Sequence, residues 1–410
     1  MRVLFTVAGW SGHYYCMVPV GWALQAAGHE VRVACQPELA ACVARSGLTP
    51  LPVLRSADLM RVARFAHLLK SAEGRRALPG LPLPLHPLTG ALGYSLSEID
   101  IAAVGAALWR DLAAHYRESA DAAVDVARSW SPDLVCHSLM SEEGPLAAAV
   151  RDVPAVFLPP GLFGAVERGN ELDMGPDDPT GSFVRHGLEP WRRERIRHVI
   201  DPSPTASVPD HGDAAVLPVR YVPYNGEPRA VPDRLRTPAS RPRVLVVWGR
   251  SAPAIFGCDV PALRSAVQCA ADLGAEVVIA APREQVDALG VLPPDTQVVT
   301  GLPFQLLLDT CDAVIHHGSA CALMTAAAAG VPQLSLALTD DAIATGQRAA
   351  TSGGALWLPA LITTQDSVRE AVEGLLSAPL RQAARALRDD LAGRRSPALL
   401  VSELQEVAAA

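Results

Sequence analysis

The chain has 410 residues, of which 50% are hydrophobic and 19% charged, a composition typical of globular proteins rather than of disordered or fibrous ones. At roughly 150 residues per domain, this length favours two domains. The formal net charge of −8 argues against a nucleic-acid partner, because affinity for nucleic acid depends on clustered lysines and arginines.

The eight cysteines include no Cys-x-x-Cys pair, and most lie in apolar runs, where a free thiol behaves as a small hydrophobic side chain. We therefore expect a reducing, cytoplasmic location and no metal site. The apolar run at residues 2–8 has no small-residue cleavage pattern after it. No later stretch reaches the roughly 18 uninterrupted apolar residues of a membrane span, so we expect a protein that is neither secreted nor embedded in a membrane.

The first half of the chain alternates short apolar runs with helical segments. Residues 3–7 form an apolar run typical of a strand that is buried on both faces of a parallel sheet. A helix is predicted over 18–27, because a proline stands near its start and a glycine follows its end. Residues 31–35 predict the next strand, and the strand, helix, strand pattern returns at 134–158. Such units imply a parallel sheet.

The segment between these two units, residues 55–95, is rich in proline and partly helical. Long segments of this kind inside a compact domain are often binding segments. We therefore predict a substrate-facing insertion here.

A linker signal follows at residues 226–242, where glycine and several prolines alternate with arginine and aspartate. Apolar strands then resume, and the predicted ones lie at 244–248, 276–280, 298–299, 313–315 and 333–336. The fold class is therefore α/β, with two doubly wound, Rossmann-like domains. We place the domains at 1–225 and 243–378. The helices of 379–410 either cap the second domain or return to the first.

A histidine and glycine motif follows a predicted strand in each half. Gly12-His13 follows the first strand, and His316-His317-Gly318 follows the strand at 313–315. Ligands bind beyond the carboxyl ends of strands in open α/β sheets, and a helix amino terminus suits phosphate. Two histidines with one satisfied by a carbonyl and the other exposed are an equally good interpretation of the second motif. A lone histidine such as His13 is, on its own, more often structural or merely exposed.

Six stretches of the chain form a pattern that is more specific than any one of them. They are residues 1–13, 18–19, 26–37 and 221–226, HHGSACA at 316–322 and AGVPQL at 329–334. Together, over essentially the whole chain, they resemble the nucleotide-sugar glycosyltransferases that tailor antibiotics.

The resemblance implies a GT-B fold and inverting transfer of a sugar to an apolar, polyketide-like acceptor held by the first domain. It places the general base at His13, whose imidazole, near an ordinary pKa of ~6.5, takes a proton from an acceptor hydroxyl. Glu142 is a candidate for an acidic residue that holds this base, with a charge on a solvated helix start as the alternative. We expect Tyr14, Tyr15 and Leu81 to contact the acceptor.

The second domain, by the same resemblance, holds a nucleotide diphosphate sugar, expected as a dTDP-linked deoxysugar, and no other cofactor. The residues expected to contact this donor are Gly249, Arg250, Ser251, His317, Gly318, Ser319 and Asp341. Two of these assignments have alternatives. Ser319 either bonds phosphate or caps the following helix, and residues 248–251 are equally plausible as a turn beside the core.

Departures from the family pattern gather on the donor side. Ala322 stands where the family has a hydroxyl, Ala342 replaces the glutamine after Asp341, and Leu302 stands where an aromatic residue is common. These departures keep two alternatives open. One is a degenerate homologue that has lost donor binding and uses the acceptor pocket and His13 for a nucleotide-independent reaction such as cyclisation. The other is a partner protein that stabilises another enzyme.

The partners expected from the sequence are a small apolar acceptor and a nucleotide sugar, with no nucleic acid and no membrane. A homodimer and an auxiliary protein stay open as further partners.

Overall fold

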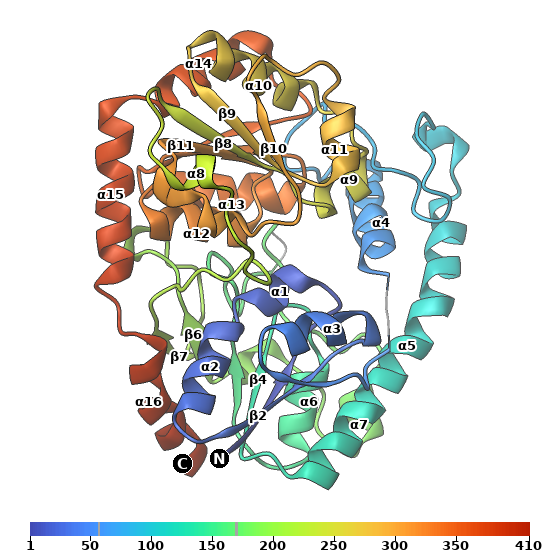
Figure 1. Ribbon diagram of the computed structural model, residues 1–410. Coiled ribbons are helices and arrows are strands. Elements are labelled where there is room, and N and C mark those ends of the chain that lie inside the picture. The colour runs from blue at the N-terminus through green and yellow to red at the C-terminus, as the bar shows by residue number, and fades with distance from the viewer. Residues whose placement is uncertain (56–57, 169–170) are drawn as a thin grey trace.

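The computed structural model describes residues 1–55, 58–168 and 171–410. It contains one parallel sheet in each half of the chain (Figure 1). The first sheet has the strand order β3-β2-β1-β4-β5-β6-β7, and the second has the order β10-β9-β8-β11-β12-β13. The predicted α/β class, with two doubly wound domains, is confirmed.

In the first half, the strands are β1 (Arg2–Thr6), β2 (Glu30–Ala34), β3 (Thr49–Leu51), β4 (Leu134–His137), β5 (Ala155–Phe157), β6 (His198–Asp201) and β7 (Ala215–Pro218). The helices are α1 (Ser11–Tyr15), α2 (Val18–Ala26), α3 (Pro37–Arg45), α4 (Leu59–Ala72), α5 (Ile101–Trp130), α6 (Glu143–Ala149) and α7 (Ser182–Arg185). The strands and helices that the sequence predicts here are present, with ends that differ by one or two residues.

In the second half, the strands are β8 (Arg243–Val247), β9 (Glu276–Ala280), β10 (Gln297–Val299), β11 (Ala313–His316), β12 (Gln333–Ala337) and β13 (Ala355–Pro359). The helices are α8 (Asp233–Arg236), α9 (Ser251–Phe256), α10 (Pro261–Asp272), α11 (Arg283–Ala288), α12 (Ala320–Ala329), α13 (Asp340–Ala350), α14 (Gln365–Leu375), α15 (Ala378–Ala392) and α16 (Pro397–Ala409).

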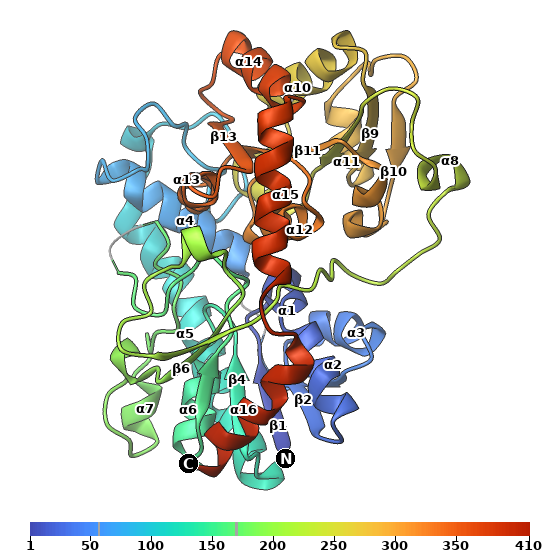
Figure 2. The same ribbon diagram turned by 90° about the vertical axis from the view of Figure 1, so that its left-hand side faces the viewer.

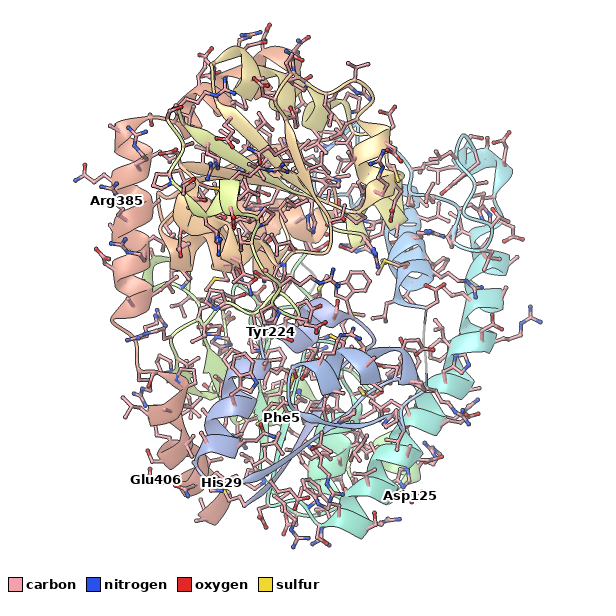
Figure 3. The ribbon with its side chains drawn as sticks, in the orientation of Figure 1. Phe5, His29, Asp125, Tyr224, Arg385 and Glu406 are labelled. Atoms are coloured by element: carbon pink, nitrogen blue, oxygen red, sulfur yellow. The ribbon has the colours of Figure 1, made fainter. Side chains whose placement is uncertain are left out.

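The central strands are buried because helices cover both faces of each sheet. Phe5 of β1 and Val246 of β8 have no exposed surface. Figure 3 shows Phe5 inside the first half, whereas the charged side chains of Asp125, Arg385 and Glu406 lie on the outside. Apolar strands of this kind therefore form the centre of each domain, and polar loops follow their carboxyl ends.

The last two helices join the two halves. α15 packs on α12 in the second half, and α16 packs on α2 in the first. Leu400 and Leu404 of α16 are fully buried in the same core as Phe5. Figure 2 shows α15 and α16 running one after the other along both halves. The domain limits drawn from the sequence stay a prediction.

The insertion predicted at 55–95 lies against the second half of the chain, and its residues 56–57 lie outside the described part. Helix α4 packs on α9. Arg64 Nε donates a hydrogen bond to the Ala254 carbonyl oxygen at 2.7 Å, and the Leu85 amide donates to the Ile255 carbonyl oxygen at 2.7 Å. The insertion therefore connects the first half of the chain to the second.

Among the helices in the described part of the chain, none has the length and apolar character to cross a bilayer.

Candidate active site between the two sheets

The two histidine and glycine loops meet where the two halves face each other. β1 leads into α1, which carries His13, and β11 leads into α12. The Cys321 thiol, in the first turn of α12, donates a hydrogen bond to the Gly12 carbonyl oxygen at 3.1 Å. In Figure 2, α1 lies below α12. The segment that carries the candidate base and the candidate phosphate-binding helix are therefore in contact.

His13 is partly buried on α1. Its Nδ1 is inaccessible to water and has no hydrogen-bond partner in the described structure. Burial lowers the pKa of His13 from 6.5 to about 4. The expectation of an ordinary imidazole pKa was wrong, because removal of water penalises the charged ring. His13 is consequently neutral at pH 7, with a nitrogen able to accept a proton.

Glu142 lies at the start of α6, and the structure shows no hydrogen bond between its described side chain and His13. Its Oε1 is buried without a partner. Burial, and then the negative charges of Glu143, Asp178 and Asp177, raises the pKa of Glu142 to about 10. The solvated-charge interpretation is therefore wrong as well, since this carboxyl keeps its proton at neutral pH.

His137 is a buried polar residue that sequence reasoning did not select. It ends β4, pairs in register with Thr6 at the end of β1, and stacks on Phe157 with ring centroids 5.3 Å apart. Neither ring nitrogen has a partner in the described residues, and burial lowers its pKa to about 3. The signal that could have identified it is its place at the carboxyl end of a buried strand.

The two histidines after β11 have different surroundings. His316 is fully buried and uses both ring nitrogens, Nε2 with Gln333 Oε1 at 2.9 Å and Nδ1 as acceptor from the Gly318 amide at 3.1 Å. His317 is also buried, and its Nδ1 lies 3.4 Å from the Gly249 amide that donates to it. The expectation of one exposed histidine was wrong. Burial lowers the pKa of His317 to about 4, against a smaller opposite effect of a hydrogen bond with Val247.

The turn into α12 is shaped for close approach of a ligand to the backbone. Gly318 has a φ of 88°, and a Cβ at this position would lie 2.5 Å from Ser335 Oγ. Ser319 is the N-cap of α12, and its hydroxyl accepts a hydrogen bond from the Ala322 amide at 3.3 Å. The capping role proposed for Ser319 is therefore present. The first N–H groups of an α-helix have no intrahelical partner and are available to an anion.

The loop after β8 lies beside this turn. A Cβ on Gly249 would be 2.9 Å from Cε1 of His317, so the absence of a side chain lets the ring pack here. Trp248 meets the His317 ring edge-on, with centroids 5.8 Å apart. Arg250 is exposed and Ser251 begins α9. These residues thus form one side of the candidate donor site.

The two aspartates at the start of α13 differ in exposure. Asp341 is half-buried and forms no ion pair with any described residue. Asp340, which sequence reasoning did not select, is fully buried and contacts His67 and Arg76 of the insertion. Asp341 is therefore the carboxylate of this pair that is free to meet a ligand.

The three residues expected to contact the acceptor do not converge on His13. Tyr14 is fully buried in the first core, where its hydroxyl bonds with Ser46, and this placement does not fit a role in acceptor contact. The Tyr15 ring meets Tyr224 edge-on at 5.3 Å. Leu81 packs beside Ile343 of α13 in the second half.

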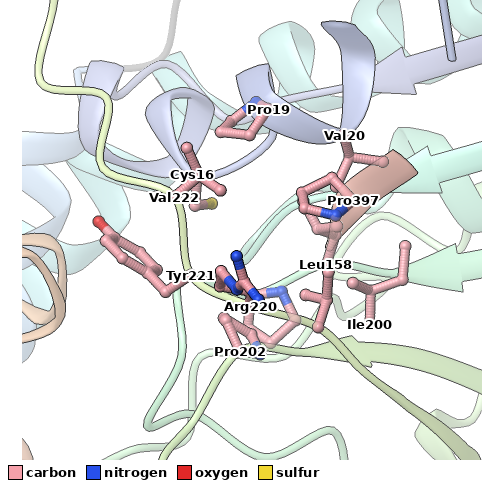
Figure 4. Close-up of a pocket in the computed structure, with 12 residues that line it drawn as sticks. Cys16, Pro19, Val20, Leu158, Ile200, Pro202, Arg220, Tyr221, Val222 and Pro397 are labelled. Atoms are coloured by element: carbon pink, nitrogen blue, oxygen red, sulfur yellow. The ribbon is translucent and has the colours of Figure 1, made fainter. Parts of the chain in front are cut away.

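A small cavity lies near α1, lined by residues that include Cys16, Tyr221 and Pro397 (Figure 4). Its volume is about 20 Å³, which holds a single water molecule. It is too small for a sugar or a nucleotide, so it is a packing defect between the first half and the start of α16.

Comparisons with known proteins place this geometry in a group of enzymes. The family model described as erythromycin biosynthesis protein CIII-like, C-terminal domain, matches residues 264–407. The corresponding N-terminal domain model matches 22–72 and 108–249.

Two curated relatives align with this chain over nearly the whole length of both proteins. The chain is 35% identical to the 10-deoxymethynolide desosaminyltransferase of Streptomyces venezuelae, with 100% of this chain and 97% of the relative covered. It is 32% identical to the tylactone mycaminosyltransferase of Streptomyces fradiae, with 100% and 93% covered. Among solved structures, glycosyltransferase VinC in complex with dTDP matches with a TM-score of 0.73 and 27% identity, covering 100% of this chain and 99% of VinC.

Proposed function

The chain belongs to the erythromycin biosynthesis protein CIII-like family of glycosyltransferases, and we propose on this premise that it transfers a deoxysugar from a dTDP donor to a polyketide acceptor. Desosaminyl and mycaminosyl transfer by the two relatives supports the sugar and acceptor classes. The dTDP bound to VinC supports the nucleotide.

The contact between α1 and α12 is the main observation behind the proposed mechanism. Gly12, the residue before His13, contacts Cys321 in the first turn of the helix that would hold the diphosphate, which supports His13 as the base. Neutral His13 accepts the proton of an acceptor hydroxyl while that oxygen attacks the anomeric carbon. The bond from that carbon to the diphosphate oxygen breaks on the opposite face, which inverts the configuration.

The leaving diphosphate is stabilised by the second half. The free N–H groups and positive dipole end of α12 face the developing charge, and Gly318 lets the phosphate approach the backbone. His317 and the loop of Gly249, Arg250 and Ser251 form the adjacent side. We assign Asp341 to a sugar hydroxyl or amine, because its carboxylate has no other ionic partner in the described chain.

The departures from the family pattern do not favour loss of donor binding. The Ser319 hydroxyl does not replace the one missing at Ala322, but as the N-cap it accepts from the Ala322 amide and supports the helical start of α12. The glycine turn and the buried histidine remain in place. The degenerate homologue and the non-catalytic partner are therefore the weaker interpretations.

Thermal unfolding with and without dTDP tests the donor site. A ligand that binds only the folded state at about 100 times its Kd stabilises it by ~2.7 kcal/mol, so we expect the Tm to rise by a few degrees. His317→Ala should remove most of this rise. His186→Ala is the matched control, since His186 lies on the first half beside Asp121. No rise with millimolar dTDP or UDP would refute the proposed donor.

A further inference from the structure

Asp340 is a carboxylate with no exposed surface at the first position of α13. Both of its oxygens are engaged by Arg76 Nε, at 3.0 and 2.9 Å. Oδ2 also lies 3.2 Å from His67 Nδ1 and 4.0 Å from Lys70 Nζ. The Lys70 ammonium is shared with Glu171. These partners come from the first half of the chain, and the carboxylate of Asp340 comes from the second.

His67, Lys70 and Arg76 belong to a segment that we call the docking segment, residues 59–85. Besides the ion pairs, it is held to the second half by the hydrogen bonds of Arg64 and Leu85 to the backbone of α9. Its residues Ala77, Leu78 and Leu81 pack on Ala342 and Ile343 of α13. The segment therefore packs with the second domain although it precedes most of the first in sequence.

The docking segment touches both walls of the candidate donor site. Its Arg76 guanidinium lies 5.4 Å from the ring centroid of Phe256, at the end of the α9 wall. The α13 wall adjoins the glycine turn, since Thr345 Oγ1 donates to the Gly318 carbonyl oxygen at 3.2 Å. A Cβ on Gly318 would be 3.1 Å from Cβ of Ala342.

From this arrangement we propose that Asp340 and Arg76 are positioning residues that dock residues 59–85 on the second domain and so form the wall around the donor sugar. Asp340 does not contact the sugar, because both its oxygens are occupied. The sugar contact falls to Asp341, one residue further along α13. The inference rests on the proposed function, because it assigns this wall to the sugar half of the nucleotide sugar.

The proposal predicts different effects on the binding of the sugar and of the diphosphate of the donor molecule. The proposed diphosphate contacts lie at α12 and the loop after β8, and neither Asp340 nor Arg76 forms a hydrogen bond or ion pair with a described residue of these two segments. Loss of Arg76 leaves a buried carboxylate short of its main partner, which is costly, so the segment should detach from α13. The sugar wall is then lost while the diphosphate contacts remain.

The test compares Arg76→Gln with Arg75→Gln. Arg75 is the neighbouring arginine, and its side chain is 58% exposed and pairs with Glu73. We expect Arg76→Gln to raise the KM for the dTDP sugar about tenfold, with kcat reduced less, because docking of the wall and not the chemical step is weakened. The Kd for dTDP alone should change less than about twofold. Arg75→Gln should change neither value, and Arg76→Lys should restore part of the lost affinity for the sugar.

Hydrogen exchange gives a readout besides activity. Amides of α4 should exchange faster in Arg76→Gln than in Arg75→Gln. Equal weakening of dTDP and of the dTDP sugar, or an unchanged KM with unchanged exchange, would overturn the inference. If the wild-type chain binds neither ligand, the proposed function fails instead, and faster exchange in Arg76→Gln would then show docking without a sugar role.

Discussion

Buried, uncharged imidazoles are a shared feature of the edge where the two halves meet. Burial lowers the pKa values of His13, His316 and His317 to about 4, and that of His137 to about 3. Protonation of any of them at neutral pH would place an unpaired charge in a buried site. Among these four, only His13 combines this neutrality with an unpartnered nitrogen on a helix that contacts α12, which distinguishes the proposed base from the other three histidines.

The first prediction concerns the pH dependence of catalysis. A protonated His13 cannot accept a proton, so kcat/KM should stay level as pH falls from 7 and decline only through the pKa of about 4. An ordinary imidazole would instead impose the decline near ~6.5. His13→Ala should lower kcat by roughly 10²- to 10⁴-fold with little change in the Kd for dTDP. The matched control is His29→Ala, at the start of β2. A decline centred near 6.5 in the wild type would contradict the burial argument.

At the scale of elements, the sequence was most informative about strands covered on both faces. Strands β1, β8 and β9 contain continuous runs of apolar residues. These runs were sufficient to predict the strands. Four strands without such runs, β3, β6, β7 and β13, were not predicted. Strands β3, β7 and β13 lie at the edges of the sheets and are only partly buried, whereas β6 is an inner strand with only two apolar residues, Val199 and Ile200. Edge strands need fewer apolar residues, so their patterns resemble loops.

The second prediction concerns α16, because the sequence did not decide which domain this helix packs on. Leu404 is fully buried against the first core, whereas Leu399, on the same helix, is 65% exposed. Leu404→Ala should lower the free energy of unfolding by about 2–5 kcal/mol, because it leaves a cavity in a packed core. Leu399→Ala should change it by less than about 0.5 kcal/mol. Denaturant unfolding of both variants measures the difference. Similar effects of the two substitutions would mean that α16 does not stabilise the first domain.

At the scale of the whole molecule, the two halves are joined by contacts between residues far apart in the chain. Asp340 meets His67 across 273 positions, and Cys321 meets Gly12 across 309. The resemblance to a family predicted His13 and His317, whose motifs are local. No local pattern identifies Asp340 as buried or brings Asp177 and Asp178 near Glu142, since both depend on which segments fold against them.

The third prediction tests how firmly the halves are joined. Arg348 of α13 donates from Nη1 to Glu167 Oε1 and to the Leu162 carbonyl oxygen, each at 2.7 Å. The Glu167 side chain is 3% exposed, so it depends on this arginine. Arg348→Met should cost about 3–5 kcal/mol of unfolding free energy, because it leaves a buried charge without its partner. Arg388→Met, which removes an exposed arginine paired with Asp389, is the control.

A variant that carries both Arg348→Met and Glu167→Gln shows why Arg348→Met lowers the free energy of unfolding. If the cost of Arg348→Met comes from the carboxylate left behind, adding Glu167→Gln should recover much of it, because the remaining amide carries no charge. Thermal and denaturant unfolding of the two single variants and the double variant form a cycle whose coupling energy measures the pair. A double variant as unstable as the sum of the two single variants would show no coupling. In that case the loop around Leu162 and the apolar contacts of α12 and α13, rather than the ion pair, would hold the two halves together.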